Sequence, residues 1–137
     1  MPNHCYQSVY VQGPRALVQE LFFSLTENNR FCDAVTPMPL DRALDSYDWR
    51  VTNWGTKWDV AEAEITQDLE VSAHEIEAWF AFRCWTAWSP PVPVWDKLHE
   101  MGVTVDAEYQ DEGGMFEGRY SDGEDECWVP DLEEEAV

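Results

Sequence analysis

The fold is decided by the stretch EIEAWFAFRC at residues 75–84. In this stretch Ile76, Ala78, Phe80 and Phe82 alternate with charged, small or aromatic side chains. Side chains of a β-strand point alternately to its two faces, so this period of two predicts a strand with one buried face. We expect it to lie in the centre of a sheet.

The segments on either side of this strand predict the rest of the architecture. A strand is expected at residues 5–11, followed at Pro14 by a helix that carries Leu17, Leu21 and Leu25 on one face and ends near residue 28. Further elements are expected as a strand at 60–66, a helix at 93–101, a strand at 103–110 and a hairpin strand at 115–120. This order predicts an α+β, ferredoxin-like (split βαβ) antiparallel sheet with two helices on one face, plus an added C-terminal hairpin strand.

The remaining segments are predicted to be irregular. Residues 28–48 read as a long connection with one short helix at 40–44, and residues 49–59 as an ordered aromatic loop. Turns are expected at 67–73 and 85–91. After Ser121 the composition is mostly acid, Gly and Pro, which predicts a ferredoxin-like domain at 1–121 and an acidic C-terminal tail at 122–137.

The net charge of −20 is the most unusual property of the composition, and 13 of the 28 acidic residues lie within residues 101–137. No apolar run reaches the roughly 18 residues of a membrane span, and the N-terminus lacks the pattern of a signal peptide. We therefore expect a cytoplasmic protein with no membrane partner. The four cysteines form no CxxC pair, which favours buried or idle thiols over a zinc site with nearby histidines, and no cofactor is expected.

Several blocks of sequence resemble the YubB ferredoxin-like family, which occurs on plasmids and bacteriophages. The blocks are MPN with Cys5, Met38-Pro39, NWGTKWD at 53–59, TAWSPPVP at 86–93 and YQDEG at 109–113. The resemblance spans about residues 1–121 and implies a ferredoxin-like fold without an iron–sulfur cluster and an origin in a mobile element. The chain departs from the family at His4, where a Trp is usual, and in its acidic tail. The family implies no activity.

The acidic C-terminal segment is the candidate binding site. Alternate carboxylates on a strand recur about every 6.8 Å, about twice the ~3.4 Å rise per phosphate along one DNA strand. Such a hairpin could mimic DNA and block the nucleic-acid-binding channel of a host defence nuclease complex (CRISPR or restriction). The candidate partner-binding residues are Asp106, Glu108, Asp111, Glu112, Glu117, Asp122, Glu124, Asp125, Glu126, Glu133, Glu134 and Glu135.

Other interpretations of the same residues stay open. The acids could bind another basic partner, keep the chain in solution, or reflect a salt-adapted source. The Trp-rich loops at 54–58 and 85–88 could form a protein-interaction surface. Lys57 and Asp59 with His74 or His99 could serve a small-molecule binder or enzyme, although they are more simply a structural ion pair. The DGEDE run at 122–126 lacks the ligand spacing of a calcium loop.

The hypothesis that we carry forward is a non-enzymatic inhibitor. Its partner is a basic nucleic-acid-binding host protein or complex. Direct binding of nucleic acid is not expected, because a net charge of −20 repels phosphate. The ferredoxin-like layout leaves a sheet edge open, through which a second copy could pair to form a dimer.

Overall fold

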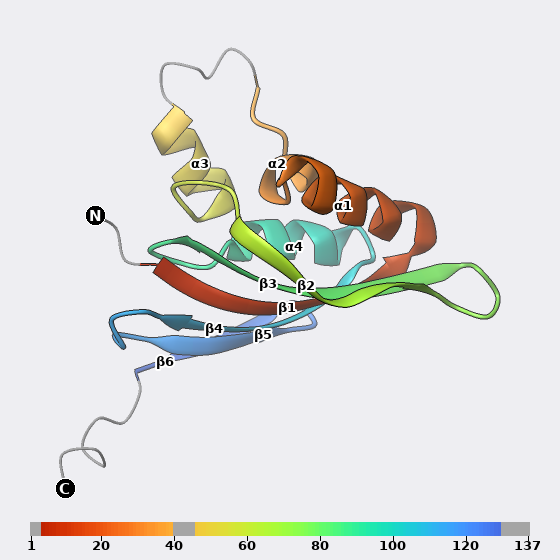
Figure 1. Cartoon of the computed structure of the whole chain (residues 1–137). Coiled ribbons are helices and arrows are strands. Elements are labelled where there is room, and N and C mark those ends of the chain that lie inside the picture. The colour runs from red at the N-terminus through yellow and green to blue at the C-terminus, as the bar shows by residue number, and fades with distance from the viewer. Residues whose placement is uncertain (1–3, 40–45, 130–137) are drawn as a thin grey trace, which may run out of the picture.

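The computed structural model describes residues 4–39 and 46–129, which form an α+β structure with one six-stranded sheet and four helices (Figure 1). All four helices lie on the same side of the sheet. The elements in chain order are β1 (His4–Pro14), α1 (Arg15–Asn28), α2 (Cys32–Val35), α3 (Ser46–Trp54), β2 (Ala61–Val71), β3 (Glu77–Ala87), α4 (Val92–Glu100), β4 (Thr104–Asp111), β5 (Glu117–Ser121) and β6 (Glu124–Trp128).

The sheet has the strand order β2-β3-β1-β4-β5-β6, and every pair of neighbours is antiparallel. β1 pairs with β3 over its whole length, from His4 opposite Ala87 to Pro14 opposite Glu77. Its other edge pairs with β4. The predicted α+β class and antiparallel sheet are thus confirmed, and the segment at 75–84 supplies an interior strand as expected.

Strict alternation separates the two faces of the sheet. On β3 the side chains of Ala78, Phe80 and Phe82 are at most 1% exposed and point toward the helices. On β1, Val9 and Val11 point the same way. The core is completed from α1, α4 and β4 by Val18, Leu21, Leu25, Trp95, Leu98, Val103, Val105 and Ala107.

The strand count differs from the prediction, because a sixth strand, β6, forms where a tail was expected. Ser121 pairs with Glu124, so only Asp122 and Gly123 connect β5 to β6. Both residues have positive φ angles, 51° and 86°, which is the conformation of a type I′ hairpin turn and is typical of an Asp-Gly pair. The acidic composition concealed this turn signal.

Four helices are present in the described ranges where two were expected. The predicted loop at 49–59 is wrong, since α3 ends only at Trp54, whose indole N–H donates to the carbonyl of Thr36 at 2.8 Å. The short helix α2 was not predicted, and the expected helix at 40–44 lies outside the described residues. None of the helices in the described chain is long and apolar enough to cross a lipid bilayer.

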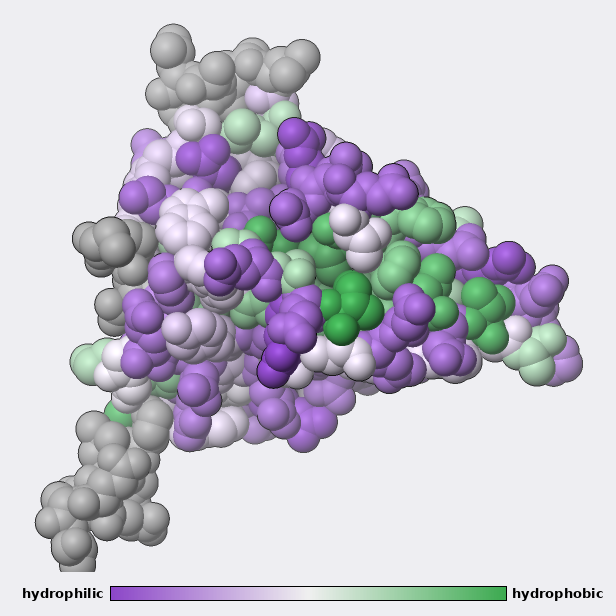
Figure 2. All heavy atoms as spheres, in the orientation of Figure 1, coloured by the Kyte–Doolittle hydropathy of each residue, from purple (hydrophilic) through white to green (hydrophobic). Residues whose placement is uncertain are grey.

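Two predicted turns are strands in the structure. β2 continues through the expected turn at 67–73 as far as Val71, with three register shifts against β3. It is an edge strand whose apolar side chains, Ala63, Ile65, Leu69 and Val71, are only partly buried against the core. Residues 66–68 in its middle are exposed, so the apolar face is interrupted, and Figure 2 shows hydrophobic residues along only part of this edge. β3 extends to Ala87, into the expected turn at 85–91. Ile76, predicted to be in the core, precedes β3 and is 68% exposed.

The carboxylate of Asp59 joins the start of α2 to the residues just before β2. Its oxygens accept backbone N–H groups from Phe31 at 3.1 Å, Cys32 at 2.8 Å and Asp33 at 3.0 Å, and also from Val60 at 2.7 Å. A carboxylate in this position satisfies the otherwise unpaired N–H groups at the start of α2 and complements its dipole. Asp59 therefore holds the irregular connection after α1 against the sheet.

The NWGTKWD and TAWSPPVP blocks pack against each other. The hydroxyl of Thr56 donates to the carbonyl of Ala87 and accepts from its N–H, and the hydroxyl of Ser89 donates to the carbonyl of Gly55. Gly55 has a φ of 78°, and a Cβ there would lie 2.7 Å from Cδ of Pro93. Two of the blocks on which the family resemblance rests thus hold the loop before β2 against the loop after β3.

Replacing the carboxylate of Asp59 tests its role as the cap of α2. We expect Asp59→Ala to lower the free energy of unfolding by about 2 kcal/mol or more. The variant removes the charged cap of α2 and leaves several part-buried backbone N–H groups without an acceptor. Asp68→Ala is the matched control, since Asp68 accepts only the N–H of Leu69 at an exposed position. Urea denaturation measures both, and equal losses would contradict the role given to Asp59.

Buried thiols predict a loss of stability at alkaline pH. Burial raises the pKa of the Cys5 thiol to about 12 and that of Cys84 further still, whereas an unfolded thiol ionises near pH 8.5. The unfolded chain therefore releases these protons first, so the contribution of the buried thiols to stability is complete below about pH 8.5 and is lost as the pH rises toward 12. Between pH 7.5 and 10.5 in reducing buffer, the free energy of unfolding from urea denaturation should fall by up to about 2 kcal/mol less for Cys5→Ala than for the wild type. Cys127→Ala, which removes an exposed thiol, should fall as steeply as the wild type.

Candidate functional site

The candidate site is the face of the sheet that the helices leave uncovered, which we call the open face. The alternation that buries Val9 and Val11 of β1 turns Tyr6 and Ser8 outward. The register places Tyr6 beside Trp85 of β3 and Ser8 beside Arg83. The open face is therefore built from the polar and aromatic half of each strand.

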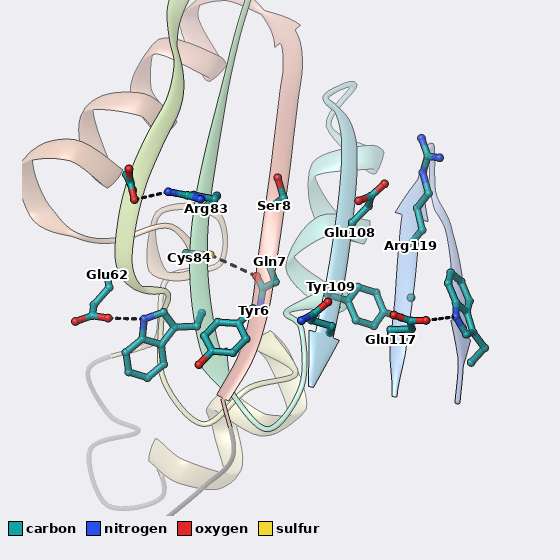
Figure 3. A pocket seen from close by; sticks show the side chains of 15 residues that line it. Tyr6, Gln7, Ser8, Glu62, Arg83, Cys84, Glu108, Tyr109, Glu117 and Arg119 are labelled. Atoms are coloured by element: carbon teal, nitrogen blue, oxygen red, sulfur yellow. Dashed lines mark hydrogen bonds and ion pairs between the residues drawn. The ribbon is translucent and has the colours of Figure 1, made fainter. Parts of the chain in front are cut away.

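Charged side chains form a row across all six strands of the open face. The pairing partners follow one another from β2 to β6, and Figure 3 shows the central part of the row. Its charges alternate in sign, three carboxylates with two guanidinium groups, and the one uncharged member is Ser8 of β1. The row consists of Glu64, Arg83, Ser8, Glu108, Arg119 and Glu126.

A shallow groove of about 830 Å³ runs over the middle of this face. Its two guanidinium groups, of Arg83 and Arg119, are both already paired, with Glu64 at 2.8 Å and with Asp106 at 3.1 Å. Hydrogen bonding to Asp106 raises the pKa of Arg119. The groove also carries the carboxylates of Glu62, Glu108 and Glu117, so its charge is net negative.

Two tryptophans of the groove bind a carboxylate through the indole N–H. Trp85 donates to Glu62 at 2.7 Å, and Trp128 donates to Glu117 at 2.9 Å. Trp128 is 46% exposed, and Tyr6, between the two tryptophans in the register, is 42% exposed. The groove therefore offers aromatic surface next to negative charge.

The end of the groove near the start of β1 is closed by an aromatic cluster. The ring centroid of His4 lies 3.5 Å from that of Trp85 and 6.0 Å from that of Trp58. The backbone N–H of His4 donates to Glu112 at 2.8 Å, and its Nδ1 lies 3.7 Å from the same carboxylate. The His4 ring, which is also 6.4 Å from that of Tyr6, thus packs against both aromatic side chains of the groove at this end.

The structure brings together only part of the predicted acidic site. Five of the twelve carboxylates share the open face: Asp106, Glu108, Glu117, Glu124 and Glu126. Glu133, Glu134 and Glu135 lie outside the described residues. The other four are placed elsewhere: Asp111, Glu112, Asp122 and Asp125.

Three of those four carboxylates serve the fold directly. Asp111 is 5% exposed and accepts the N–H of Met115 in the turn after β4. Glu112 accepts the N–H of His4, and Asp125 accepts the hydroxyl of Tyr109 at 2.6 Å. Asp122 lies in the β5–β6 turn, 3.8 Å from His99. The described acids of the predicted site therefore do not all lie on one face of the sheet.

Two buried tyrosines attach the C-terminal strands to the rest of the fold. Tyr109 of β4 crosses Gly118 of β5 to reach Asp125 of β6, and a Cβ on Gly118 would collide with the tyrosine ring. Tyr120 of β5 donates to Asp96 of α4 at 2.7 Å. Burial and the accepting carboxylates raise the pKa of both phenols. The open face thus extends to β6 as one surface.

The other candidate sets are separated. Within the described chain no ion pair joins Lys57 to Asp59. Lys57 instead lies 5.3 Å from the ring centroid of Trp88 and 5.9 Å from that of Tyr47, and Asp59 caps α2. In the described ranges, no three His, Cys, Asp or Glu side chains are arranged to hold a metal ion, and the DGEDE run forms a hairpin turn and strand.

Sequence reasoning missed the β2, β1 and β3 side of the site. Tyr6, Arg83, Glu62 and Glu64 were not predicted to bind, and Trp85 was assigned to a turn. The alternation of the two strands at 5–11 and 75–84 could have indicated this surface. If helices cover one face of the sheet, the outward side chains of adjacent strands must share the opposite face. Only the pairing of β1 between β3 and β4 could show that this surface joins the acidic hairpin.

Comparison of the chain with protein-family models, with curated proteins and with solved structures finds no match in any of the three. The resemblance to the YubB ferredoxin-like family therefore stays a prediction that rests on the quoted blocks.

Removing the phenol hydroxyl of Tyr109 tests how β6 is attached. We expect Tyr109→Phe to lower the free energy of unfolding by about 1.5 kcal/mol, since a hydrogen bond to a carboxylate is lost. Amide hydrogen exchange in β6 should accelerate more than exchange in β1. Tyr10→Phe is the control, because its hydroxyl binds Gln12 of the same strand. Unchanged exchange in β6 would mean that Tyr109 does not hold this strand.

Proposed function

We propose that this protein is a non-enzymatic inhibitor that mimics DNA and occupies the nucleic-acid-binding surface of a basic protein partner through the open face of its sheet. The observation that carries the proposal is the net negative groove, in which both arginines are already neutralised by carboxylates of the same face. A surface of this kind attracts Lys and Arg side chains and repels phosphate.

The spacing of the exposed carboxylates supports mimicry of a phosphate backbone. Glu124 and Glu126 are alternate residues of β6, so they recur about every 6.8 Å along the strand. Glu108, two strands away, is about 10 Å from this pair across the sheet. Glu108, Glu124 and Glu126 are all exposed, and none forms an ion pair within the described residues.

We also propose that the platform is ferredoxin-like. The support is the order β2-β3-β1-β4 of the first four strands, together with α1 between β1 and β2 and α4 between β3 and β4. β5 and β6 would be additions to the β4 edge. The partner class follows from the resemblance to a plasmid and bacteriophage family: a cytoplasmic host defence nuclease complex, of the CRISPR or restriction type.

A second candidate surface lies at the loop after β3. Trp88 is 40% exposed with a φ of 71°, a conformation that is unusual for a bulky residue, and Tyr47 is 43% exposed. Lys57 lies over both rings. An interaction module that used this aromatic cluster would bind with little dependence on salt, which distinguishes it from the charged open face.

Charge reversal on matched faces tests the proposed function. The protein is immobilised to capture bacterial lysate proteins at low ionic strength, and the captured proteins are eluted with duplex DNA. Each eluted protein is then purified and bound to a fluorescent DNA duplex. The inhibitor is titrated into this complex, and release of the duplex is measured. We expect displacement of the duplex to weaken steeply as salt rises, and to weaken at least about tenfold with the triple change Glu64→Lys, Glu108→Lys and Glu126→Lys.

The control is a triple change of equal charge on the helices: Glu20→Lys, Glu27→Lys and Glu100→Lys. All six positions are exposed, so neither variant should unfold. The helix variant should displace the duplex as well as the wild type does. If both variants lost displacement equally, total charge and not the open face would account for it. If the open-face variant displaced the duplex as well as the wild type, the proposal would be overturned.

A further inference from the structure

We propose that the open-face groove binds an extended peptide segment with two arginine side chains about six residues apart, one seated on Trp85 and the other on Trp128. This inference rests on the proposed function, and it names the chemistry by which the basic partner is recognised. Each arginine would stack its guanidinium on an indole ring and pair with the carboxylate that the same indole binds.

Each tryptophan and its carboxylate form a built cation site. Because Glu62 accepts the indole N–H of Trp85, and Glu117 that of Trp128, the N–H edge of each ring is occupied. The exposed face of Trp128 remains for a ligand, whereas the His4 ring packs against Trp85 at 3.5 Å between centroids and leaves a ligand only the other face of that ring. An indole that donates to an anion has a more electron-rich ring face, which strengthens its attraction for a cation. The same arrangement occurs at both ends of the groove.

The resident arginines do not already fill these sites. Arg83 is held by Glu64, and Arg119 is held by both carboxylate oxygens of Asp106, at 3.3 Å and 3.1 Å. No cation–π contact of either guanidinium with an aromatic ring occurs within the described residues. The aromatic surface of the groove is thus available to a cation from outside.

The separation of the two sites sets the length of the ligand. Trp85 lies on β3 and Trp128 on β6, four strand spacings apart, which is about 19 Å on a flat sheet. An extended chain advances about 3.3 Å per residue, so two side chains about six residues apart reach both sites. Tyr6, Gln110 and Glu108 lie between them and contact the connecting segment.

Arginine fits these sites better than lysine does. A planar guanidinium can stack on the ring and donate two hydrogen bonds to the adjacent carboxylate at once, whereas an ammonium is a compact and strongly hydrated point charge. A nucleobase would also stack on the rings, but its phosphate would meet the carboxylates of the groove. The geometry therefore selects a cationic peptide over a nucleic acid.

Fluorescence anisotropy with labelled 12-residue peptides of Gly and Ser tests the inference. One peptide carries two arginines six residues apart, and matched peptides carry two lysines or two citrullines at the same positions. Citrulline keeps the shape of arginine without its charge. We expect the arginine peptide to bind at least about fivefold more tightly than the lysine peptide, and the citrulline peptide to show no saturable binding.

Trp128→Ala should weaken binding of the arginine peptide at least about fivefold, because it removes one ring. Phe23→Ala is the control, since Phe23 of α1 is similarly exposed but lies outside the groove, and it should bind like the wild type. Circular dichroism checks that both variants are folded. Glu117→Gln, which keeps the acceptor for Trp128 but removes the charge, should lose part of the preference for arginine over lysine.

Equal affinity for the arginine and lysine peptides, or wild-type affinity in Trp128→Ala, would overturn the inference. In either case, if the triple open-face reversal still abolished displacement of duplex DNA, the proposed function would stand without it. If that triple reversal had no effect on displacement while Trp128→Ala impaired binding of the arginine peptide, the peptide site would stand and DNA mimicry would fall.

Discussion

The structure depends on one constraint: helices cover only one face of a sheet whose central strands alternate between buried and exposed side chains. On β1 the alternation sends Val9 and Val11 into the core and Tyr6 and Ser8 to the open face. Burial of the helix side supplies the main favourable free energy, at roughly 25 cal/mol for each Å² of apolar surface removed from water. A shift of one residue in the pairing would move the apolar side chains to the solvent side, so register and composition are coupled. The open face is consequently the one broad surface of the sheet where side chains are chosen for something other than packing.

Part of the acidic character serves the fold, which changes the meaning of the net charge of −20. Asp59 caps α2, Asp111 closes the turn after β4, and Asp96 and Asp125 receive the buried tyrosines. These carboxylates are acceptors for donors that would otherwise be unsatisfied, and removing them would cost stability before it changed any binding. The carboxylates of the open face are only part of the exposed acids that remain for recognition. Total charge alone therefore overstates the strength of any electrostatic binding surface.

The strongly periodic parts of the fold could be predicted from the sequence, and the parts set by pairing could not. Residues 75–84 and 103–110 alternate so clearly that both strands were expected, and the Leu17, Leu21 and Leu25 stripe predicted α1. β6 was missed because its Asp122-Gly123 turn lies among acidic residues. α3 was missed because the aromatic segment at 49–59 was interpreted as an ordered loop. The candidate site was found only in part. Glu108, Glu124 and Glu126 were expected, but Glu62, Arg83 and Tyr6 join them only through the order β2-β3-β1-β4-β5-β6.

The side chains around the exposed carboxylates indicate whether these acids serve solubility or recognition. A face that only keeps a protein in solution needs charge and little exposed aromatic surface, because exposed rings favour association. The open face instead places Tyr6 and Trp128, each more than two-fifths exposed, beside Glu117 and near Glu108. Desolvating such rings is favourable only against a partner that also satisfies the adjacent charge. Aromatic surface and uncompensated carboxylates on one side of a rigid sheet therefore favour a cationic, partly apolar contact over a purely solvated face.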